Sequence, residues 1–291
     1  MPRPPTVAEL LSTLEADQAA FATRLTLDFD PRIEVDGVGA IALPISAGTA
    51  HRLCAQATLA RHGYKDETRL DLDVLDVRDT WEIPASAVRL TAEGWPAVLD
   101  HTLARIQEEL GLPTASRLTA APDKLLIYGP GQFFLPHQDT EKEDGMMATL
   151  IITLPSDFSG SEFRVSHQNQ TLRSRGSRKH LSVVAFYADC PHEARPVTAG
   201  YRVVLTYNLM LPETSAPQRL PEQGVQAVAD ALTRHWNTPV PSRWAHDRER
   251  PAPDRLVFLL DHEYTQRSLS WKRLKGVDRP RALALREAAR L

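Results

Sequence analysis

Residues 124–139 have the sequence KLLIYGPGQFFLPHQD, and this stretch gives the clearest indication of the fold. An apolar run at 124–128 ends in a turn rich in glycine and proline, and a second apolar run follows directly. Short apolar or β-branched runs between such turn residues are typical of β-strands. The stretch therefore predicts two strands joined by a tight turn, with the triplet His137-Gln138-Asp139 after the second strand.

Four more short apolar runs follow, at residues 148–154, 162–165, 181–187 and 202–209. Gly, Pro, Asp and Ser separate them, and no convincing helical pattern lies between them. Parallel strands need long crossover connections, usually helices, whereas antiparallel strands do not. The middle of the chain therefore predicts an antiparallel β-sandwich or jelly roll.

The residues before and after this core show a different pattern of apolar residues. The apolar periodicity predicts helices at 6–24, 47–61 and 93–110, a strand at 39–45, and strand and loop at 66–82. Thr6 and Glu9 form a capping box at the first helix, so helices are expected to dominate the first third. Beyond the core, the predicted elements are a helix at 225–236, a strand at 256–260 and a helix at 279–291.

These elements predict an α+β protein with a mainly β core that N-terminal helices buttress. Residues 1–120 are expected to form that buttress as part of the same domain, and residues 121–210 the core. Residues 211–291 are expected to form a C-terminal extension, which either packs on the core or leads into a longer protein.

The composition narrows the functional classes. The chain has 34 Lys+Arg and 37 Asp+Glu, a formal net charge of −3, so neither a nucleic-acid partner nor an anionic membrane is expected. The two cysteines are far apart in the sequence, which fits a reducing compartment. The N-terminus lacks the apolar stretch of a signal peptide, and no run approaches a membrane span. We therefore expect a cytoplasmic protein.

Three residues are candidates for binding a metal ion. On a strand, side chains at i and i+2 point the same way, so His137 and Asp139 can share one ion. His192, just after the predicted strand at 181–187, is the candidate third ligand. Two imidazoles and one carboxylate leave coordination positions open, which suits Fe(II), whereas a structural zinc site is closed.

Arg202 is a candidate for binding an anion. It begins the predicted strand that follows His192, and a guanidinium forms two-pronged ion pairs with carboxylates. Together, His137, Asp139, His192 and Arg202 in this order are much more specific than any one of them alone.

This ordered set resembles the Fe(II)/2-oxoglutarate-dependent dioxygenases, in particular their prolyl 4-hydroxylase-like branch. The resemblance covers about residues 124–209 and rests on Tyr128-x-x-Gly131-Gln132-Phe133-x-x-x-His137-x-Asp139, His192 and Gly200-x-Arg202. The stretch from Phe133 to Lys142 is also similar to a group of uncharacterised bacterial and fungal members. Prolyl 4-hydroxylases proper often have Lys where Arg202 stands, so the substrate stays open.

The resemblance implies a double-stranded β-helix that uses Fe(II), 2-oxoglutarate and O2. It implies His137, Asp139 and His192 as the iron ligands. It further implies that Arg202 pairs with the 2-oxoglutarate C5 carboxylate, and that Tyr128 hydrogen-bonds nearby. Thr153 and Thr206 are expected to line the pocket. The implied reaction is hydroxylation of a C–H bond in an amino-acid or protein side chain, with succinate and CO2 as coproducts.

Two alternatives stay open at this point. The chain could be a non-catalytic metal- or ligand-binding jelly roll. It could be a zinc hydrolase with Glu193 as general base, although neighbours on a strand face opposite ways. Nucleic-acid demethylases of this superfamily carry a second Arg six residues after the first. Here that position is Asn208, which together with the near-neutral charge argues against nucleic-acid repair. The sequence leaves the substrate, a small molecule or a protein, and the oligomeric state undecided.

Overall fold

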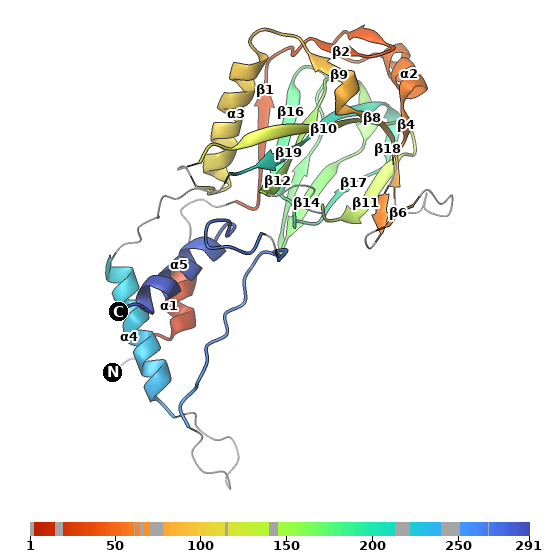
Figure 1. Cartoon of the computed structure of the whole chain (residues 1–291). Helices are drawn as coiled ribbons and strands as arrows, with labels where there is room; N and C mark the ends of the chain where they lie inside the picture. The colour runs from red at the N-terminus through yellow and green to blue at the C-terminus, as the bar shows by residue number, and fades with distance from the viewer. Residues whose placement is uncertain are drawn as a thin grey trace. The chain divides into compact units, whose positions relative to one another are not determined.

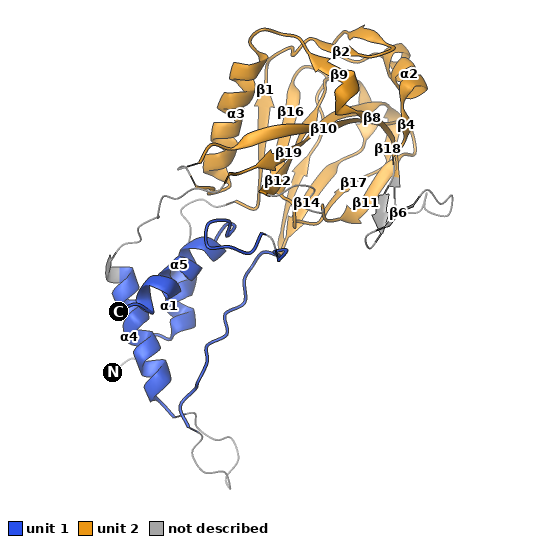
Figure 2. Cartoon of the chain, in the orientation of Figure 1, with its two compact units in different colours: residues 1–19, 213–291 blue, residues 20–212 orange. Residues whose placement is uncertain are grey.

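The computed structural model describes residues 3–14, 20–60, 62–64, 67–69, 78–113, 116–139, 145–212, 222–239, 251–266 and 268–291. The chain divides into two compact units, one of residues 1–19 with 213–291 and one of residues 20–212 (Figure 2). The residues predicted to carry the chemistry all lie in the second of these.

The larger sheet of the 20–212 unit is antiparallel, with the strand order β1-β16-β12-β19-β10-β8-β4 (Figure 1). Its strands are β1 (Ala22–Leu27), β4 (Thr58–Leu59), β8 (Trp81–Pro84), β10 (Thr119–Tyr128), β12 (Met146–Thr153), β16 (Leu181–Tyr187) and β19 (Arg202–Met210). β12 and β16 are buried along their whole length, which explains why they read as continuous apolar runs.

A second antiparallel sheet has the order β15-β14-β17-β11-β7. Its strands are β7 (Arg78–Asp79), β11 (Phe133–His137), β14 (Phe163–His167), β15 (Gln170–Ser174) and β17 (His192–Ala194). Phe163 of this sheet packs against Phe186 of the larger one, with ring centroids 5.7 Å apart. The two layers share one apolar core, which confirms the predicted double-stranded β-helix.

Shorter elements complete this unit. They are β2 (Ile33–Val35), β3 (Gly39–Ile41), β5 (His62–Tyr64), β6 (Glu67–Arg69), β9 (Val88–Leu90), β13 (Phe158–Gly160), β18 (Val197–Gly200), the 3-10 turn η2 (Ala85–Ala87), and the helices α2 (Ala47–Gln56) and α3 (Trp95–Glu109). α3 buries Leu103 and Ile106 in the same core as the sheets. Just beyond its end, the Leu110 carbonyl accepts a 2.6 Å hydrogen bond from the Tyr187 hydroxyl, which ties this helix to β16.

The other unit contains α1 (Val7–Thr13), α4 (Glu222–Asn237) and α5 (Asp278–Ala288). The predicted capping box between Thr6 and Glu9 is present at α1. Apolar side chains of the three helices form a separate core around Leu11 and Val228. Asp278 accepts hydrogen bonds from the backbone N–H groups of Asp261 and His262, which ties the preceding loop to α5.

Three predictions about the elements are wrong. The first helix was predicted over 6–24, but α1 ends at Thr13 and Ala22–Leu27 forms β1, which pairs in register with β16. The first third is therefore not dominated by helices. Residues 256–260 are not a strand: Leu256 and Phe258 pack in the helical core while Val257 and Leu259 are exposed. Their alternation is that of a strand, but no neighbouring strand pairs with them in the part of the chain that the structure describes.

The predicted division at residues 120 and 210 stays a prediction. Residues 1–19 group with 213–291, whereas α2 and α3 share the core of the 20–212 unit. Among the helices that the structure describes, none combines the length and the apolar character that crossing a bilayer requires.

Gly200, in the predicted Gly200-x-Arg202 motif, is a position where only glycine fits. Its φ is +72°, and a Cβ built on it would overlap the carbonyl oxygen of Asp157. We expect Gly200→Ala to lower the free energy of unfolding by about 2 kcal/mol or more, because steric overlap adds to backbone strain of about 1–3 kcal/mol. Urea unfolding of the variant and the parent measures this difference.

Gly39→Ala is the matched control. Gly39 has a similar φ of +83°, but a Cβ there would meet no atom within 4 Å. We expect the control to lose only the conformational part, about 1 kcal/mol. Equal losses in the two variants would contradict the steric role of Gly200.

Candidate active site

His137 and His192 face each other on neighbouring strands of the smaller sheet. His137 ends β11, His192 begins β17, and the two residues are direct partners in the antiparallel register. Asp139 follows two residues after β11, where its backbone N–H donates a 3.0 Å hydrogen bond to the Ala188 carbonyl. Strand pairing thus brings a His from a distant part of the sequence to the H-x-D triplet.

The structure brings the three side chains close together. One ligating atom from each lies within 4.8 Å of those of the other two. His192 Nε2 is 3.7 Å from Asp139 Oδ2, and the two imidazole centroids are 4.1 Å apart. His192 is only 5% exposed, while His137 and Asp139 are half-buried. The cluster is therefore enclosed on the His192 side and open on the side of the triplet.

Backbone carbonyl groups orient both imidazoles. The Nδ1 atoms lie 2.8 Å from the Leu135 carbonyl oxygen for His137 and 3.1 Å from the Cys190 carbonyl oxygen for His192. A carbonyl oxygen only accepts, so each Nδ1 carries the proton and each Nε2 keeps its lone pair for a metal ion. Each carbonyl lies two residues before its histidine, so this fixing is local in the chain.

The Asp139 carboxylate is held by a residue that the sequence analysis missed. The Thr149 hydroxyl donates a 2.6 Å hydrogen bond to Asp139 Oδ2. The sequence could have indicated Thr149 as a pocket residue. It lies on β12 four residues before Thr153, which was predicted to line the pocket. Residues i and i+4 share a strand face.

Arg202 lies on the inner face of the larger sheet. It is 3% exposed, stands opposite Tyr128 in the strand register, and its Nη2 donates a 3.3 Å hydrogen bond to Thr153 Oγ1. The guanidinium carbon is 5.5 Å from the centroid of the Tyr128 ring and 5.4 Å from that of Phe163. The structure thus brings Arg202, Tyr128 and Thr153 together.

The guanidinium of Arg202 is a buried cation without an acidic partner in the part of the chain that the structure describes. No carboxylate of the described residues forms an ion pair with it. Burial therefore lowers the pKa of Arg202 from its ordinary value. A buried charge normally has a counter-ion, so this position suits the carboxylate of a bound ligand. Together with the two Nε2 atoms and the Asp139 carboxylate, the residues fit Fe(II) and a dicarboxylate.

Thr206 lies four residues after Arg202 on β19. Its hydroxyl is 3.2 Å from the Lys124 carbonyl oxygen and 3.3 Å from Asp123 Oδ2, and it has no described hydrogen bond to Arg202. Asn208, two residues further along β19, is 7% exposed and stands opposite Thr149 in the register.

Gln132 has a structural role in the motif that precedes His137. Its side-chain oxygen accepts a 2.7 Å hydrogen bond from the Gly129 N–H, and its side-chain nitrogen donates a 2.7 Å bond to Asp79. Gly131, at φ +86°, donates its N–H to the Val197 carbonyl. The turn therefore has a fixed shape, and it sets Tyr128 and β11 relative to each other.

Glu193 does not act on the cluster as the zinc-hydrolase alternative requires. Its carboxylate lies 3.6 Å from Arg164 and 3.9 Å from Arg195. A general base would need to face the metal-bound water. Ion pairs to two arginines leave this carboxylate poorly suited to that role.

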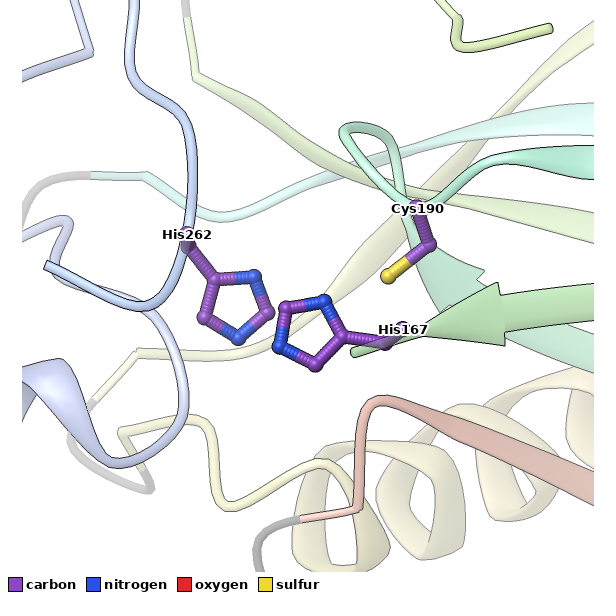
Figure 3. Close-up of side chains that lie close together, drawn as sticks. All are labelled: His167, Cys190 and His262. Atoms are coloured by element: carbon purple, nitrogen blue, oxygen red, sulfur yellow. The ribbon is translucent and has the colours of Figure 1, made fainter. Parts of the chain in front are cut away.

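Both cysteines are free thiols. Cys190 is buried in the turn after β16, and Figure 3 shows its thiol beside the His167 ring at the end of β14. Cys54 is half-buried, and burial raises the pKa of its thiol. His262, which Figure 3 also labels, belongs to the unit of residues 1–19 and 213–291.

Comparison with known proteins gives one family match. Residues 124–210 match the family model described as the 2OG-Fe(II) oxygenase superfamily. A search of the curated proteins found no match.

Among solved structures, the chain is similar to a prolyl-4-hydroxylase of Pseudomonas putida, at 20% identity and TM-score 0.42, over 71% of this chain and 100% of that chain. It is also similar to an oxidoreductase of the 2OG-Fe(II) oxygenase family from Burkholderia pseudomallei, at 15% identity and TM-score 0.38, over 72% and 93%. A third is a prolyl hydroxylase of Trichoplax adhaerens, in complex with a peptide of hypoxia inducible factor, at 14% identity and TM-score 0.42, over 70% and 88%.

The family model spans both strands that carry Tyr128 and Arg202, and it spans the three residues that converge as metal-binding candidates. Thr153, which contacts Arg202, and Thr149, which contacts Asp139, also lie within residues 124–210. Residues 124–210 therefore match the 2OG-Fe(II) oxygenase superfamily. This match, together with the converging candidate ligands, supports a 2-oxoglutarate-dependent dioxygenase that takes Fe(II), 2-oxoglutarate and O2.

Proposed function

We propose that the enzyme hydroxylates a C–H bond of an amino-acid or protein side chain. With Fe(II), 2-oxoglutarate and O2 bound, the chemistry inserts one oxygen atom into that bond and releases succinate and CO2. The observation that carries this proposal is the buried guanidinium of Arg202, which has no acidic partner among the described residues and lies in the same β-sandwich as the His137–Asp139–His192 cluster.

In this proposal each residue has a defined task. His137, Asp139 and His192 hold the iron through two imidazole nitrogens and one carboxylate oxygen. Arg202 pairs with the C5 carboxylate of 2-oxoglutarate, and Thr153 adds a hydroxyl at the same place. Burial strengthens that ion pair, because little water remains to compete for the guanidinium.

Tyr128 and Thr206 have supporting tasks in the proposal. The Tyr128 ring lies beside the Arg202 guanidinium and offers its hydroxyl to the same carboxylate. Thr206 lines the pocket farther along β19, beyond the residues that bind the carboxylate. The substrate itself is a small molecule or a protein. Two of the similar structures are prolyl hydroxylases, and one of them is in complex with a peptide. Peptides are therefore the first substrates to test. A cytoplasmic location stays a prediction.

Iron-dependent consumption of 2-oxoglutarate tests the proposal. We expect purified protein with Fe(II), ascorbate and O2 to form succinate slowly, and faster when a true substrate is present. Chelation by EDTA should abolish succinate formation and added Fe(II) should restore it, because the three protein ligands exchange their metal. Succinate is measured by mass spectrometry.

The non-catalytic jelly roll remains the competing function. It predicts that the protein binds metal or a dicarboxylate but forms no succinate under any condition. Iron-loaded protein that binds 2-oxoglutarate, yet gives no succinate with a peptide and amino-acid library, would decide for this alternative.

A further inference from the structure

Thr149 lies on an interior strand of the larger sheet. It belongs to β12, which pairs with β16 on one side and β19 on the other, so Thr149 has Phe186 and Asn208 as its direct partners. The residue is 6% exposed. Threonine is also stiff about χ1 because its Cβ is branched. The position of the Thr149 hydroxyl is therefore set by the sheet.

Asp139, by contrast, lies outside any strand. Its backbone N–H donates a hydrogen bond to the Ala188 carbonyl. The 2.6 Å bond from Thr149 to Oδ2 has the length of a charge-assisted O–H···O⁻ hydrogen bond.

We propose that Thr149 is a positioning residue that locks the Asp139 carboxylate in the orientation needed for metal binding. This inference rests on the proposed function of Asp139 as a metal ligand. The hydroxyl occupies one lone pair of Oδ2, which disfavours chelation of a metal through both carboxylate oxygens. A carboxylate that gives one oxygen to the metal leaves more coordination positions for 2-oxoglutarate and O2.

The same strand face supports the two halves of the site. Thr149 contacts the metal-binding carboxylate, and Thr153, four residues later, contacts the guanidinium of Arg202. A strand rises by about 3.3 Å per residue, so the Cα atoms of Thr149 and Thr153 are roughly 13 Å apart along β12. One strand thus contributes a hydroxyl to each of the two groups.

The affinity for Mn(II) tests the inference without any turnover. Free Mn(II) is measured by its electron paramagnetic resonance signal during titration of the metal-free protein. We expect Thr149→Val, which keeps the shape and removes the hydroxyl, to weaken Mn(II) binding by about 10- to 100-fold, the usual effect of losing an outer partner of a metal ligand. Thr149→Ser keeps the hydroxyl and should stay within about threefold of the parent.

Thr153→Val is the matched control. It is the same substitution on the same face of the same strand, so it reports any general effect of losing a buried threonine hydroxyl. We expect Thr153→Val to retain the Mn(II) affinity of the parent and to weaken 2-oxoglutarate binding. The melting temperature of each metal-free variant shows that the fold is intact.

Each outcome separates this inference from the proposed function. If the parent binds Mn(II) no more tightly than Asp139→Ala, the metal site itself is wrong. If the parent binds Mn(II) and Thr149→Val binds it equally well, only the role of Thr149 is overturned. If Thr149→Ser loses as much affinity as Thr149→Val, the hydroxyl is not the cause and the inference is overturned as well.

Discussion

Arg202→Met should weaken 2-oxoglutarate binding by about two orders of magnitude or more. A buried carboxylate that loses its charged partner costs about 2–5 kcal/mol, which corresponds to roughly a 30-fold to several-thousand-fold higher Kd. His137 and His192 lie on strands of the other sheet and Asp139 follows β11, so metal affinity should survive. Calorimetric titration of 2-oxoglutarate into the metal-loaded variant measures the change.

The same substitution should stabilise the protein without ligand. The guanidinium is 3% exposed and has no acidic partner in the described part of the chain, so it carries a desolvation cost that methionine removes. The contacts with Tyr128 and Phe163 offset part of that cost. We expect a net gain of about 1–2 kcal/mol in the free energy of unfolding.

Arg202→Lys separates charge from geometry. Lysine supplies the charge without the two-pronged contact, so it should retain part of the 2-oxoglutarate affinity. An Arg202→Met variant that binds 2-oxoglutarate like the parent would show that the cosubstrate lies elsewhere. A variant that is both weaker in binding and less stable would show that Arg202 acts in packing.

Asp139→Ala should abolish succinate formation, to below about 1% of the parent rate. The substitution removes one of three metal ligands, and it removes the negative charge that offsets the metal ion. It also leaves the Thr149 hydroxyl without its acceptor. Mn(II) titration and the succinate assay with added Fe(II) measure the two losses.

Asp100→Ala is the control for losing a carboxylate. Asp100 lies on α3 and pairs with Arg117 at the surface, where an ion pair contributes about 0–1 kcal/mol. This variant should keep the parent activity and metal affinity. Full succinate formation by Asp139→Ala would remove Asp139 from the metal site and leave the triplet without a role.

The strands of the core could be predicted because their apolar patterns are local. The run at 181–187 coincides with β16, and those at 148–154 and 202–209 differ from β12 and β19 by two residues or fewer at each end. These strands are buried on both faces, so almost every position must be apolar. The triplet with His137 and Asp139 was visible for a similar reason, since residues i and i+2 share a face in any strand.

Elements whose state depends on a distant partner could not be predicted in this way. Residues 22–24 lie at the end of the predicted helix. Residues 22–27 nevertheless form β1, because β16 has a free edge with which they pair. Residues 256–260 alternate like a strand but have no strand beside them among the described residues. In both cases pairing across the chain overrides local preference.

The residue types and their order along the chain were enough to name the candidates for binding a metal and an anion. The contacts that hold most of these residues depend on the folded protein. The Thr149 hydroxyl beside Asp139 and the burial of Arg202 without an acidic partner among the described residues arise from strand register and from sheet-on-sheet packing. Register joins residues far apart in the chain, so the orientation and charge of each group in the site exist only once the two sheets have formed.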